Sequence, residues 1–207
     1  MRVNKKNKRF VYLISPKKIK NEEFYIRLNQ VLSSKIVSFF QLRLKKTNSK
    51  NKIFIGKKIK KICKKYQVKF IINDDPIIAK KVNADGCHLG QKDMNIYNAR
   101  KLLKNKIIGV TCHNSLNLVK KGIREGANYL ALGAFYSSKT KKTKYKASLK
   151  ILSFAKKLTN IPIVAIGGIK DTNYKKLLLN KANFLAISGY IWNNKKLNPK
   201  EAINKLI

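Results

Sequence analysis

Eight short apolar runs, separated by lysine-rich segments, constrain the fold of this 207-residue chain more than any other feature. The intervening segments carry apolar residues at helical spacing, as at Ile55, Ile59 and Ile62. Near-continuous apolar runs are typical of parallel strands that helices cover. The sequence therefore predicts alternating βα units around a parallel sheet. The expected strands are residues 10–14, 37–42, 69–72, 86–89, 107–110, 129–132, 161–166 and 184–187.

The number of βα units favours a closed barrel over an open sheet. Eight units in about 200 residues fit the short end of the α/β class known as the (βα)8, or TIM, barrel. A doubly wound open sheet often carries a GxGxxG turn after its first strand, whereas Ile14 is followed here by Ser-Pro-Lys-Lys. We expect a single (βα)8 domain over residues 1–207, with a basic leader at 1–8. A last helix is expected at 198–207, with Pro199 in its first turn.

The charge of the chain is strongly positive, with 48 Lys+Arg against 9 Asp+Glu and a formal net charge of +39. Only six of the basic residues are Arg, and the lysines are spread along the whole chain. No arginine-rich arm or RNA-binding aromatic motif is present, so we expect no dedicated nucleic-acid partner. A generally positive surface does attract anionic small molecules.

The expected location is cytoplasmic, without a membrane partner. No apolar run reaches the ~18 residues that a membrane-spanning helix needs. The run at 10–14 is too short for a signal peptide. Three cysteines, an odd number, fit a reducing compartment and no disulfide framework.

The scarcity of carboxylates makes each of them informative, and four of the nine lie between residues 74 and 93. Asp74 and Asp93 follow neighbouring strands and can share a hard cation, because Mg²⁺ takes one or two carboxylates plus substrate phosphates. The alternative is loop capping, which Asp also favours. Asp75 precedes Pro76 and is expected to cap a helix. Asp85 lies at the opposite end of its strand, where a structural role is expected.

Further polar residues follow the other strands, at the barrel end where active sites lie. Arg43 and Lys45 alternate to one face and can bind pyrophosphate oxygens. The segment 137–142 combines hydroxyls with cations, and Gly167-Gly168 and Ser188-Gly189 resemble the phosphate cup that barrels form after strands 7 and 8. Two anion sites together predict two phosphorylated small-molecule substrates.

The pairs Cys87-His88 and Cys112-His113 do not predict a zinc site. Adjacent residues of a strand point to opposite faces, so the four side chains do not converge easily. We expect His88 to be structural. His113, near the mouth of the barrel, is an acid/base candidate.

Seven stretches of the chain, in order and at barrel-like spacing, together resemble the thiamine-phosphate synthase family. The resemblance implies a Mg²⁺-dependent transferase that joins hydroxymethylpyrimidine diphosphate to a thiazole phosphate and releases pyrophosphate. It also implies a dissociative alkyl transfer without an enzyme nucleophile, and suggests a homo-oligomer. The stretches are FFQLRLKK, FIINDD, NADGCHLGQKDM, IIGVTCHN, YLALGAFYSSKTKK, IPIVAIGGI and LAISG.

The resemblance also implies roles for individual residues. Three cations, Arg43, Lys45 and Lys141, would stabilise charge on the departing pyrophosphate, and Asp74 and Asp93 would hold Mg²⁺. The pyrimidine diphosphate would be bound by Gln41, Leu42, Arg43, Leu44, Lys45, Asn73, Thr111 and Lys141. The thiazole phosphate would be bound by Ser138, Lys139, Thr140, Gly168, Ile187 and Ser188.

Three positions differ from the residues usual in the family. Leu44 replaces a Glu, Ser137-Ser138 replaces Pro-Thr, and Thr111 replaces a Ser. A thiazole tautomerase-like relative, which keeps a histidine at the position of His113, is one alternative. A non-catalytic protein that binds phosphorylated ligands or nucleic acid is another. Neither needs the pyrophosphate and Mg²⁺ residues that this chain retains.

Overall fold

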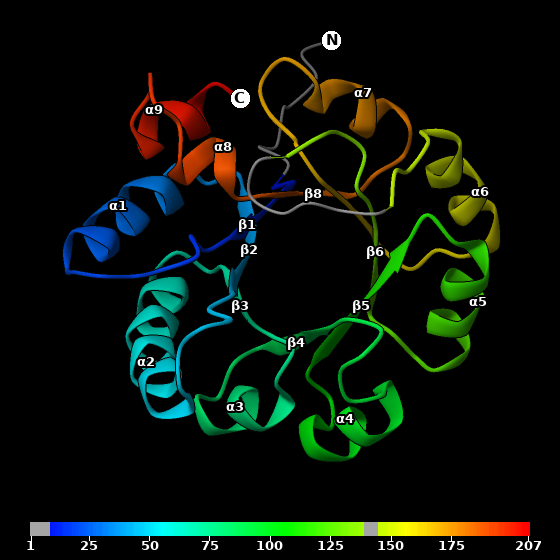
Figure 1. The fold of residues 1–207 in the computed structure, drawn as a ribbon, viewed down its shortest axis with the longest axis horizontal. Helices are drawn as coiled ribbons and strands as arrows, with labels where there is room; N and C mark the ends of the chain where they lie inside the picture. Colours follow the sequence, from blue (N-terminus) through cyan, green and yellow to red (C-terminus); the bar gives the residue numbers. More distant parts are fainter. Residues whose placement is uncertain (1–8, 139–144) are drawn as a thin grey trace, which may run out of the picture.

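Within residues 9–138 and 145–207, which the structure describes, eight parallel strands close into one barrel in chain order (Figure 1). The structure is a computed structural model. Strand β1 pairs with both β2 and β8, which closes the sheet. The expected (βα)8 barrel is therefore confirmed. The strands are β1 (Val11–Ile14), β2 (Val37–Leu42), β3 (Lys69–Asn73), β4 (Gly86–Leu89), β5 (Ile107–His113), β6 (Tyr129–Gly133), β7 (Ile163–Ile166) and β8 (Phe184–Ile187).

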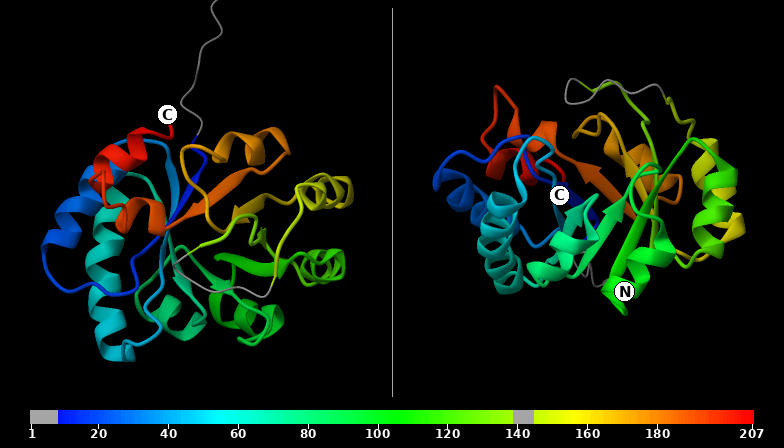
Figure 2. Two further views of the ribbon diagram at one scale, coloured as in Figure 1. Left: turned by 45° about the horizontal axis from the view of Figure 1, so that its top comes forward. Right: turned by 60° about the horizontal axis from the view of Figure 1, so that its bottom comes forward.

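Helices surround the barrel and cover the outer face of the strands (Figures 1 and 2). The last helix lies beside the first, which completes the ring of helices on that side of the barrel. The helices are α1 (Glu23–Leu32), α2 (Ser49–Lys65), α3 (Pro76–Lys81), α4 (Ile96–Leu103), α5 (Leu116–Arg124), α6 (Lys150–Leu158), α7 (Tyr174–Leu179), α8 (Gly189–Trp192) and α9 (Pro199–Asn204).

The strand boundaries differ from the expected ones mainly at β5 and β7. Strand β5 continues to His113, three residues beyond the expected end, because the ladder with β6 resumes after an irregularity between Thr111 and His113. Strand β7 begins at Ile163 rather than residue 161, since Pro162 has no N–H to donate to a ladder. Helix α9 has Pro199 in its first turn, as expected, but ends at Asn204 rather than at 207.

Two apolar layers hold the barrel. The larger layer lies between the strands and the surrounding helices. The smaller fills the barrel interior and includes Tyr12, Ile71 and Tyr129. The ring of Tyr129 needs the absence of a side chain at Gly109, because a Cβ there would lie 1.8 Å from its Cζ atom. The interior is thus a packed core that closes the barrel below its mouth.

No helix in the described part of the chain is both long and apolar enough to cross a membrane. The basic leader expected at residues 1–8 lies outside the described residues.

Candidate active site

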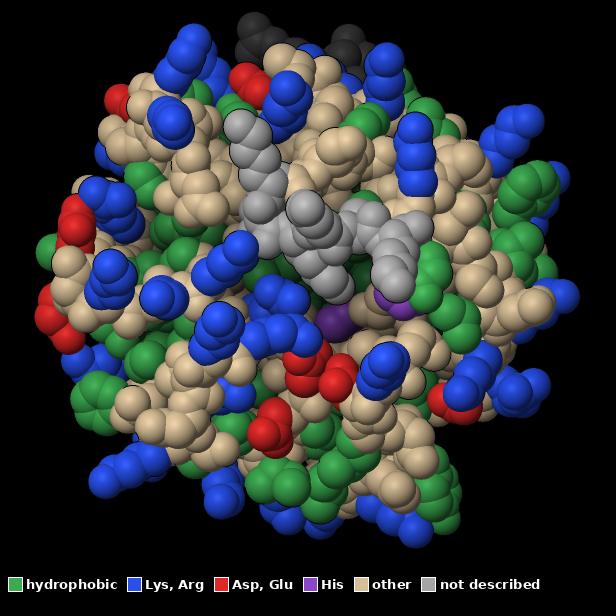
Figure 3. Space-filling model, in the orientation of Figure 1, with side chains coloured by type: hydrophobic (Ala, Val, Ile, Leu, Met, Phe, Trp, Pro, Cys, Tyr) green, Lys and Arg blue, Asp and Glu red, His purple; other side chains and the backbone are tan. Residues whose placement is uncertain are grey.

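Polar and charged side chains gather at the carboxyl mouth of the barrel, as the sequence predicts. Figure 3 shows Lys or Arg side chains beside Asp or Glu side chains near the centre of this face, with histidine next to them. Lysines are scattered over the rest of the face, whereas the acidic side chains are few. The centre of the mouth is therefore where opposite charges meet.

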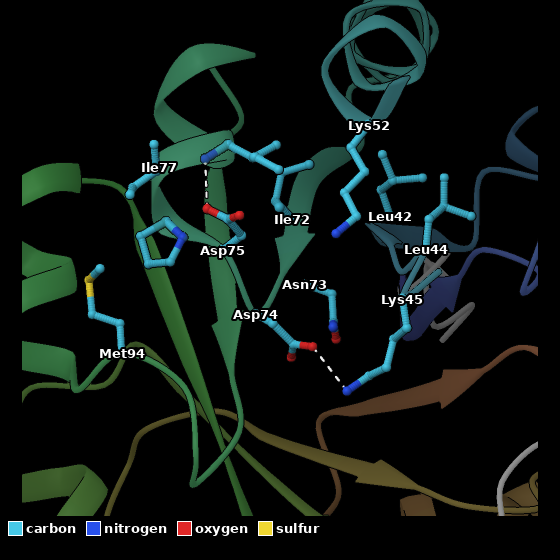
Figure 4. A pocket seen from close by; sticks show the side chains of 12 residues that line it. Leu42, Leu44, Lys45, Lys52, Ile72, Asn73, Asp74, Asp75, Ile77 and Met94 are labelled. Atoms are coloured by element: carbon cyan, nitrogen blue, oxygen red, sulfur yellow. Dashed lines mark hydrogen bonds and ion pairs between the residues drawn. The ribbon is translucent and has the colours of Figure 1, made fainter. Parts of the chain in front are cut away.

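A cavity of about 480 Å³ opens beside the loops that follow β2 and β3. Its lining combines Lys45, Asn73 and Asp74 with the apolar side chains of Leu42 and Leu44 (Figure 4). Lys52, from the first turn of α2, also lines it. The cavity therefore carries both cationic and anionic groups.

Lys45 and Asp74 point toward each other across this cavity and form an ion pair, with 3.1 Å between Nζ and Oδ2 (Figure 4). Asp74 has a positive φ of 66°, a conformation that Asp tolerates better than most residues. Its backbone N–H donates to the carbonyl of His88 at 2.8 Å, so β4 holds the residue in place. The site carboxylate is thus fixed by its backbone before any ligand binds.

Asp93 lies next to Asp74. Its carboxylate accepts a hydrogen bond from the N–H of Gly90 at 2.7 Å, and a Cβ at position 90 would lie only 2.9 Å from it. Burial raises the pKa of Asp93, the nearby Asp74 carboxylate raises it further, and the Gly90 N–H and Lys45 oppose the shift. A carboxylate whose ionisation is disfavoured by a neighbouring carboxylate is compatible with a divalent cation shared by the two.

The two carboxylates are compatible with a divalent-cation site. Among the described residues, no group of three or more His, Cys, Asp or Glu side chains surrounds one point. The two carboxylates would therefore share the cation with water and substrate oxygens, as Mg²⁺ prefers. Asp74 and Asp93 fit the ion that the sequence predicts there.

The segment Gln41–Lys45 alternates between two environments. The side chains of Leu42 and Leu44 lie in the layer under the helices, where they also line the cavity of about 480 Å³. Only their backbone atoms can face a ligand in the barrel mouth. Gln41 is only 2% exposed. The backbone N–H of Arg43 donates to Ser15 Oγ at 2.9 Å. This segment offers a polar face to the site and an apolar face to the core.

A chain of hydrogen bonds leads from the barrel interior to the mouth. Tyr12 Oη lies 2.7 Å from Tyr129 Oη, which lies 2.9 Å from His88 Nδ1. The other ring nitrogen, His88 Nε2, lies 2.8 Å from Thr111 Oγ1. Burial lowers the pKa of His88 to about 4, so the ring is neutral at physiological pH. His88 is thus held through both ring nitrogens in the barrel interior.

Sequence reasoning missed Tyr12 and Tyr129. Both lie in strands that read as apolar, and both rings are buried. A buried tyrosine usually finds a hydrogen-bond partner for its hydroxyl, which is the one feature that would have marked them. Both hydrogen bonds of Tyr129, to Tyr12 and to His88, join residues that are far apart in the sequence.

The two cysteine–histidine pairs separate between faces. Cys87 is buried under the helices, whereas His88 faces the barrel interior, as strand alternation predicts. His113 has a positive φ of 52° and stacks on Tyr145, with 4.0 Å between ring centroids. The side chain of Gln91 donates to the carbonyl of Thr111, which ties the loop after β4 to β5.

The loops after β6 and β7 meet on the other side of the mouth, and the loop after β8 contacts the loop after β1. Gly167 and Gly168 both have positive φ, 109° and 61°, and a Cβ at Gly168 would lie 2.3 Å from the carbonyl oxygen of Ser137. Ser188 Oγ donates to the carbonyl of Ser15 at 3.1 Å. The glycines bring two loops into contact around the expected phosphate cup. Lys139, Thr140 and Lys141, also expected at the site, lie outside the described residues.

Two other acids have the structural roles expected for them. Asp75 Oδ1 accepts from the N–H of Ile78 at 2.9 Å and caps α3. Asp85, at the opposite end of the barrel, accepts from Lys60 Nζ at 2.6 Å and from the N–H of Phe70 at 2.7 Å. Both carboxylates therefore already have hydrogen-bond partners with a structural role.

Comparisons with known proteins point to one family. Residues 11–191 match the family model described as thiamine monophosphate synthase. The thiamine-phosphate synthase of Pelagibacter ubique is 71% identical over 206 residues, which cover 100% of both chains. That of Clostridium acetobutylicum is 35% identical over 195 residues, 93% of this chain and 92% of the relative. A solved structure, the thiamine phosphate pyrophosphorylase from Pyrococcus furiosus, is 26% identical with a TM-score of 0.85, covering 97% of this chain and 94% of that one.

Proposed function

The chain belongs to the thiamine monophosphate synthase family, and on this premise we propose that it joins a hydroxymethylpyrimidine diphosphate to a thiazole phosphate. The products are thiamine monophosphate and pyrophosphate, which makes the protein a transferase. The observation that carries this activity is the Asp74–Asp93 carboxylate pair beside Lys45. A tautomerase-like relative would have no use for that pair.

Asp74 and Asp93 would hold Mg²⁺. When bound, the ion offsets negative charge on the diphosphate as the bond to the pyrimidine methylene weakens. The support for this assignment is the adjacency of the two carboxylates and the raised pKa of Asp93.

Arg43, Lys45 and Lys141 would bind the diphosphate and stabilise the charge that develops on it as it leaves. Lys45 pairs with Asp74 at 3.1 Å, so the protein itself holds the ammonium group beside the proposed metal site. Gln41, Asn73 and Thr111 would orient the same substrate. These residues would therefore contribute electrostatic stabilisation and substrate positioning, and no side chain would act as a nucleophile.

The thiazole phosphate would lie against Ser138, Lys139, Thr140, Gly168, Ile187 and Ser188. The close approach of two loops at Gly168 supports this location of the phosphate. The loop after β7 contacts the loop after β6 there because Gly168 has no side chain. A phosphate held on this side of the mouth leaves the thiazole ring to face the pyrimidine site. The thiazole nitrogen then captures the pyrimidine methylene after pyrophosphate has left.

We place this reaction in the cytoplasm, since Cys63, Cys87 and Cys112 are free and buried, which suits a reducing compartment. The chain would act as one (βα)8 domain over residues 1–207. Self-association remains a prediction, which sedimentation of the purified protein tests.

The deciding experiment is a coupling assay with both substrates and Mg²⁺, following thiamine phosphate and pyrophosphate together. Arg43→Ala and Asp93→Ala should each reduce the rate by at least ~100-fold. Glu125→Gln, which alters a carboxylate on the outer helix layer, is the matched control and should keep the wild-type rate. Full activity in both site variants would overturn the site assignment. A folded wild-type protein without coupling activity would overturn the function.

A further inference from the structure

The hydrogen-bond chain inside the barrel has one buried end and one end at the site. Tyr12 is 2% exposed, and its hydroxyl has Tyr129 as its hydrogen-bond partner among the described residues. Thr111, at the other end, is partly exposed at the mouth. Between them, His88 uses both ring nitrogens, one for each neighbour. The four side chains come from β1, β6, β4 and β5 and so span the barrel.

Tyr12, the buried end of the hydrogen-bond chain, determines which group is the donor in each of the three hydrogen bonds. A hydroxyl has one proton, and a buried proton without an acceptor costs the full desolvation of that group. The Tyr12 proton has Tyr129 Oη as its acceptor, so Tyr12 donates to Tyr129. The Tyr129 proton must then go to His88 Nδ1, and a neutral ring carries its own proton on Nε2. That proton is donated to Thr111 Oγ1.

The opposite direction leaves a buried proton unpaired. If Thr111 donated to Nε2, the His88 proton would lie on Nδ1 and be donated to Tyr129. Tyr129 would then donate to Tyr12, whose own proton would point into the apolar layer of the barrel interior. A doubly protonated His88 ring would donate from both nitrogens, so Tyr129 could not donate to Nδ1 and one buried tyrosine proton would again lack an acceptor. Only one direction satisfies every donor.

The surrounding packing keeps this arrangement rigid. Gly109 provides the room that the Tyr129 ring occupies. His88 and Tyr129 stack with 5.6 Å between ring centroids. At the other end, the Thr111 carbonyl accepts from Gln91. The side chain and backbone of Thr111 are therefore both held in place.

We propose that His88 and Tyr129 are positioning residues that fix the Thr111 hydroxyl as a hydrogen-bond donor to an anionic oxygen of the substrate. Because Thr111 Oγ1 accepts from His88, its own proton is left for the ligand. A donor suits a diphosphate oxygen, whereas a hydroxyl turned the other way would present lone pairs to it. The inference rests on the proposed function in that Thr111 is taken to face the pyrimidine diphosphate.

The first test reads the proton on His88 directly and does not depend on activity. The chain has two histidines, so ¹⁵N-imidazole NMR spectra of the wild type and of His113→Gln assign both rings. We expect a neutral His88 ring with its proton on Nε2 in the wild type and in Tyr12→Phe. In Tyr12→Phe, Tyr129 becomes the buried end and still donates to Nδ1. A proton on Nδ1 in the wild type would overturn the proposal, whatever the coupling assay shows.

The second test separates positioning from mere stability. Tyr129→Phe removes the donor to Nδ1 and should raise KM for the pyrimidine diphosphate about tenfold, with KM for the thiazole phosphate unchanged. Tyr12→Phe, which removes a buried hydroxyl from the same chain, is the matched control and should leave both values within about twofold. Equal effects of the two variants would indicate loss of packing and contradict the proposal.

A double-mutant cycle shows whether Tyr129 acts through Thr111. Thr111→Val should raise the same KM, and Tyr129→Phe added to it should have no further effect, because the hydroxyl that it positions is already gone. Thr111→Ser keeps a hydroxyl and should retain the sensitivity to Tyr129→Phe. Additive effects in the Val background would overturn the inference. Absence of coupling in the wild type, with the expected Nε2 proton, would instead refute the proposed function alone.

Discussion

Lys45 and Asp74 are paired across the barrel mouth, with 3.1 Å between the ammonium nitrogen and a carboxylate oxygen. Both are assigned to ligands, Lys45 to the diphosphate and Asp74 to Mg²⁺. The ion pair therefore brings together two opposite charges that the proposed reaction needs for different ligands. If the proposed roles hold, binding exchanges this internal pair for contacts with the substrate and the metal, and the two residues have opposite effects on metal affinity.

Lys45→Met should strengthen Mg²⁺ binding in the absence of substrate, because Asp74 loses a competing cation. The same change should raise KM for the pyrimidine diphosphate by at least about tenfold, since a charge-assisted contact to phosphate is lost. Calorimetric Mg²⁺ titration and steady-state kinetics measure the two effects. Lys52→Met, in the same cavity, is the control and should change Mg²⁺ affinity little. Weaker Mg²⁺ binding by Lys45→Met would contradict this interpretation of the pair.

Asp93→Asn should make the metal-free protein slightly more stable at neutral pH. The pKa of Asp93 is raised above its usual 3.8, so the folded protein holds this proton more tightly than the unfolded chain. Stability from this group is present below pH 3.8 and falls as the pH rises through the raised pKa. The variant avoids that loss, and its melting temperature at pH 7 should be higher by on the order of 1–2 °C, because solvent screens a partly exposed carboxylate.

Mg²⁺ should reverse this order. Millimolar Mg²⁺ should raise the melting temperature of the wild type, since a ligand that binds the folded state stabilises it. Asp93→Asn lacks one of the two ligands and should respond less. Thermal scans at pH 4 to 7, with and without Mg²⁺, measure both effects. An equal response of the two proteins to Mg²⁺ would remove Asp93 from the metal site.

Gly109→Ala should be strongly destabilising. Its Cβ would lie 1.8 Å from Tyr129 Cζ in a packed interior, and overpacking of this kind costs about 3 kcal/mol or more. Gly126→Ala is the matched control, since position 126 has a positive φ of 80° but no atom near the new Cβ; it should cost only ~1 kcal/mol. Urea unfolding compares the two. Equal urea midpoints for the two variants would show that the Tyr129 ring can move to accommodate a side chain at position 109.

Asp85→Asn should reduce stability without reducing kcat. The carboxylate accepts from Lys60 and from the Phe70 N–H, and loss of charged hydrogen bonds at a partly buried site costs about 1–3 kcal/mol. Glu22→Gln, which breaks the exposed pair with Lys58, should barely change unfolding. Urea midpoints and the coupling rate are the two readouts. A fall in kcat at unchanged stability would assign Asp85 to the chemistry.

Most of the fold was predictable because helical and strand periodicities alternate cleanly along the chain. Strand β5 was cut short because Thr111 and His113 are polar, although in a barrel a strand can end in site residues that still pair with β6. The Asp74–Asp93 pair was predictable because neighbouring parallel strands end at the same edge. The interaction of the two carboxylates with Lys45 could not be predicted, because it depends on side-chain positions that the periodicity of the sequence does not determine.

The hydrogen-bond chain was beyond prediction for a different reason. Tyr12 and Tyr129 are 117 positions apart, and neither lies near a recognisable motif. Their meeting depends on barrel closure and on the space left by Gly109. Strand alternation does assign His88 to the interior face, but it does not say which hydroxyls reach its two nitrogens.

Two bonds at the junction of β8 and β1 bear on how the chain is made. Ser188 Oγ donates to the carbonyl of Ser15, and Trp192 Nε1 donates to the carbonyl of Ile14, which joins residues 173 and 178 positions apart. During synthesis, β1 therefore waits for nearly the whole polypeptide before its second neighbour emerges from the ribosome. Contacts so distant in sequence form late. Closure of the barrel between β8 and β1 is therefore the pairing with the largest sequence separation, and it cannot form until β8 has been synthesised.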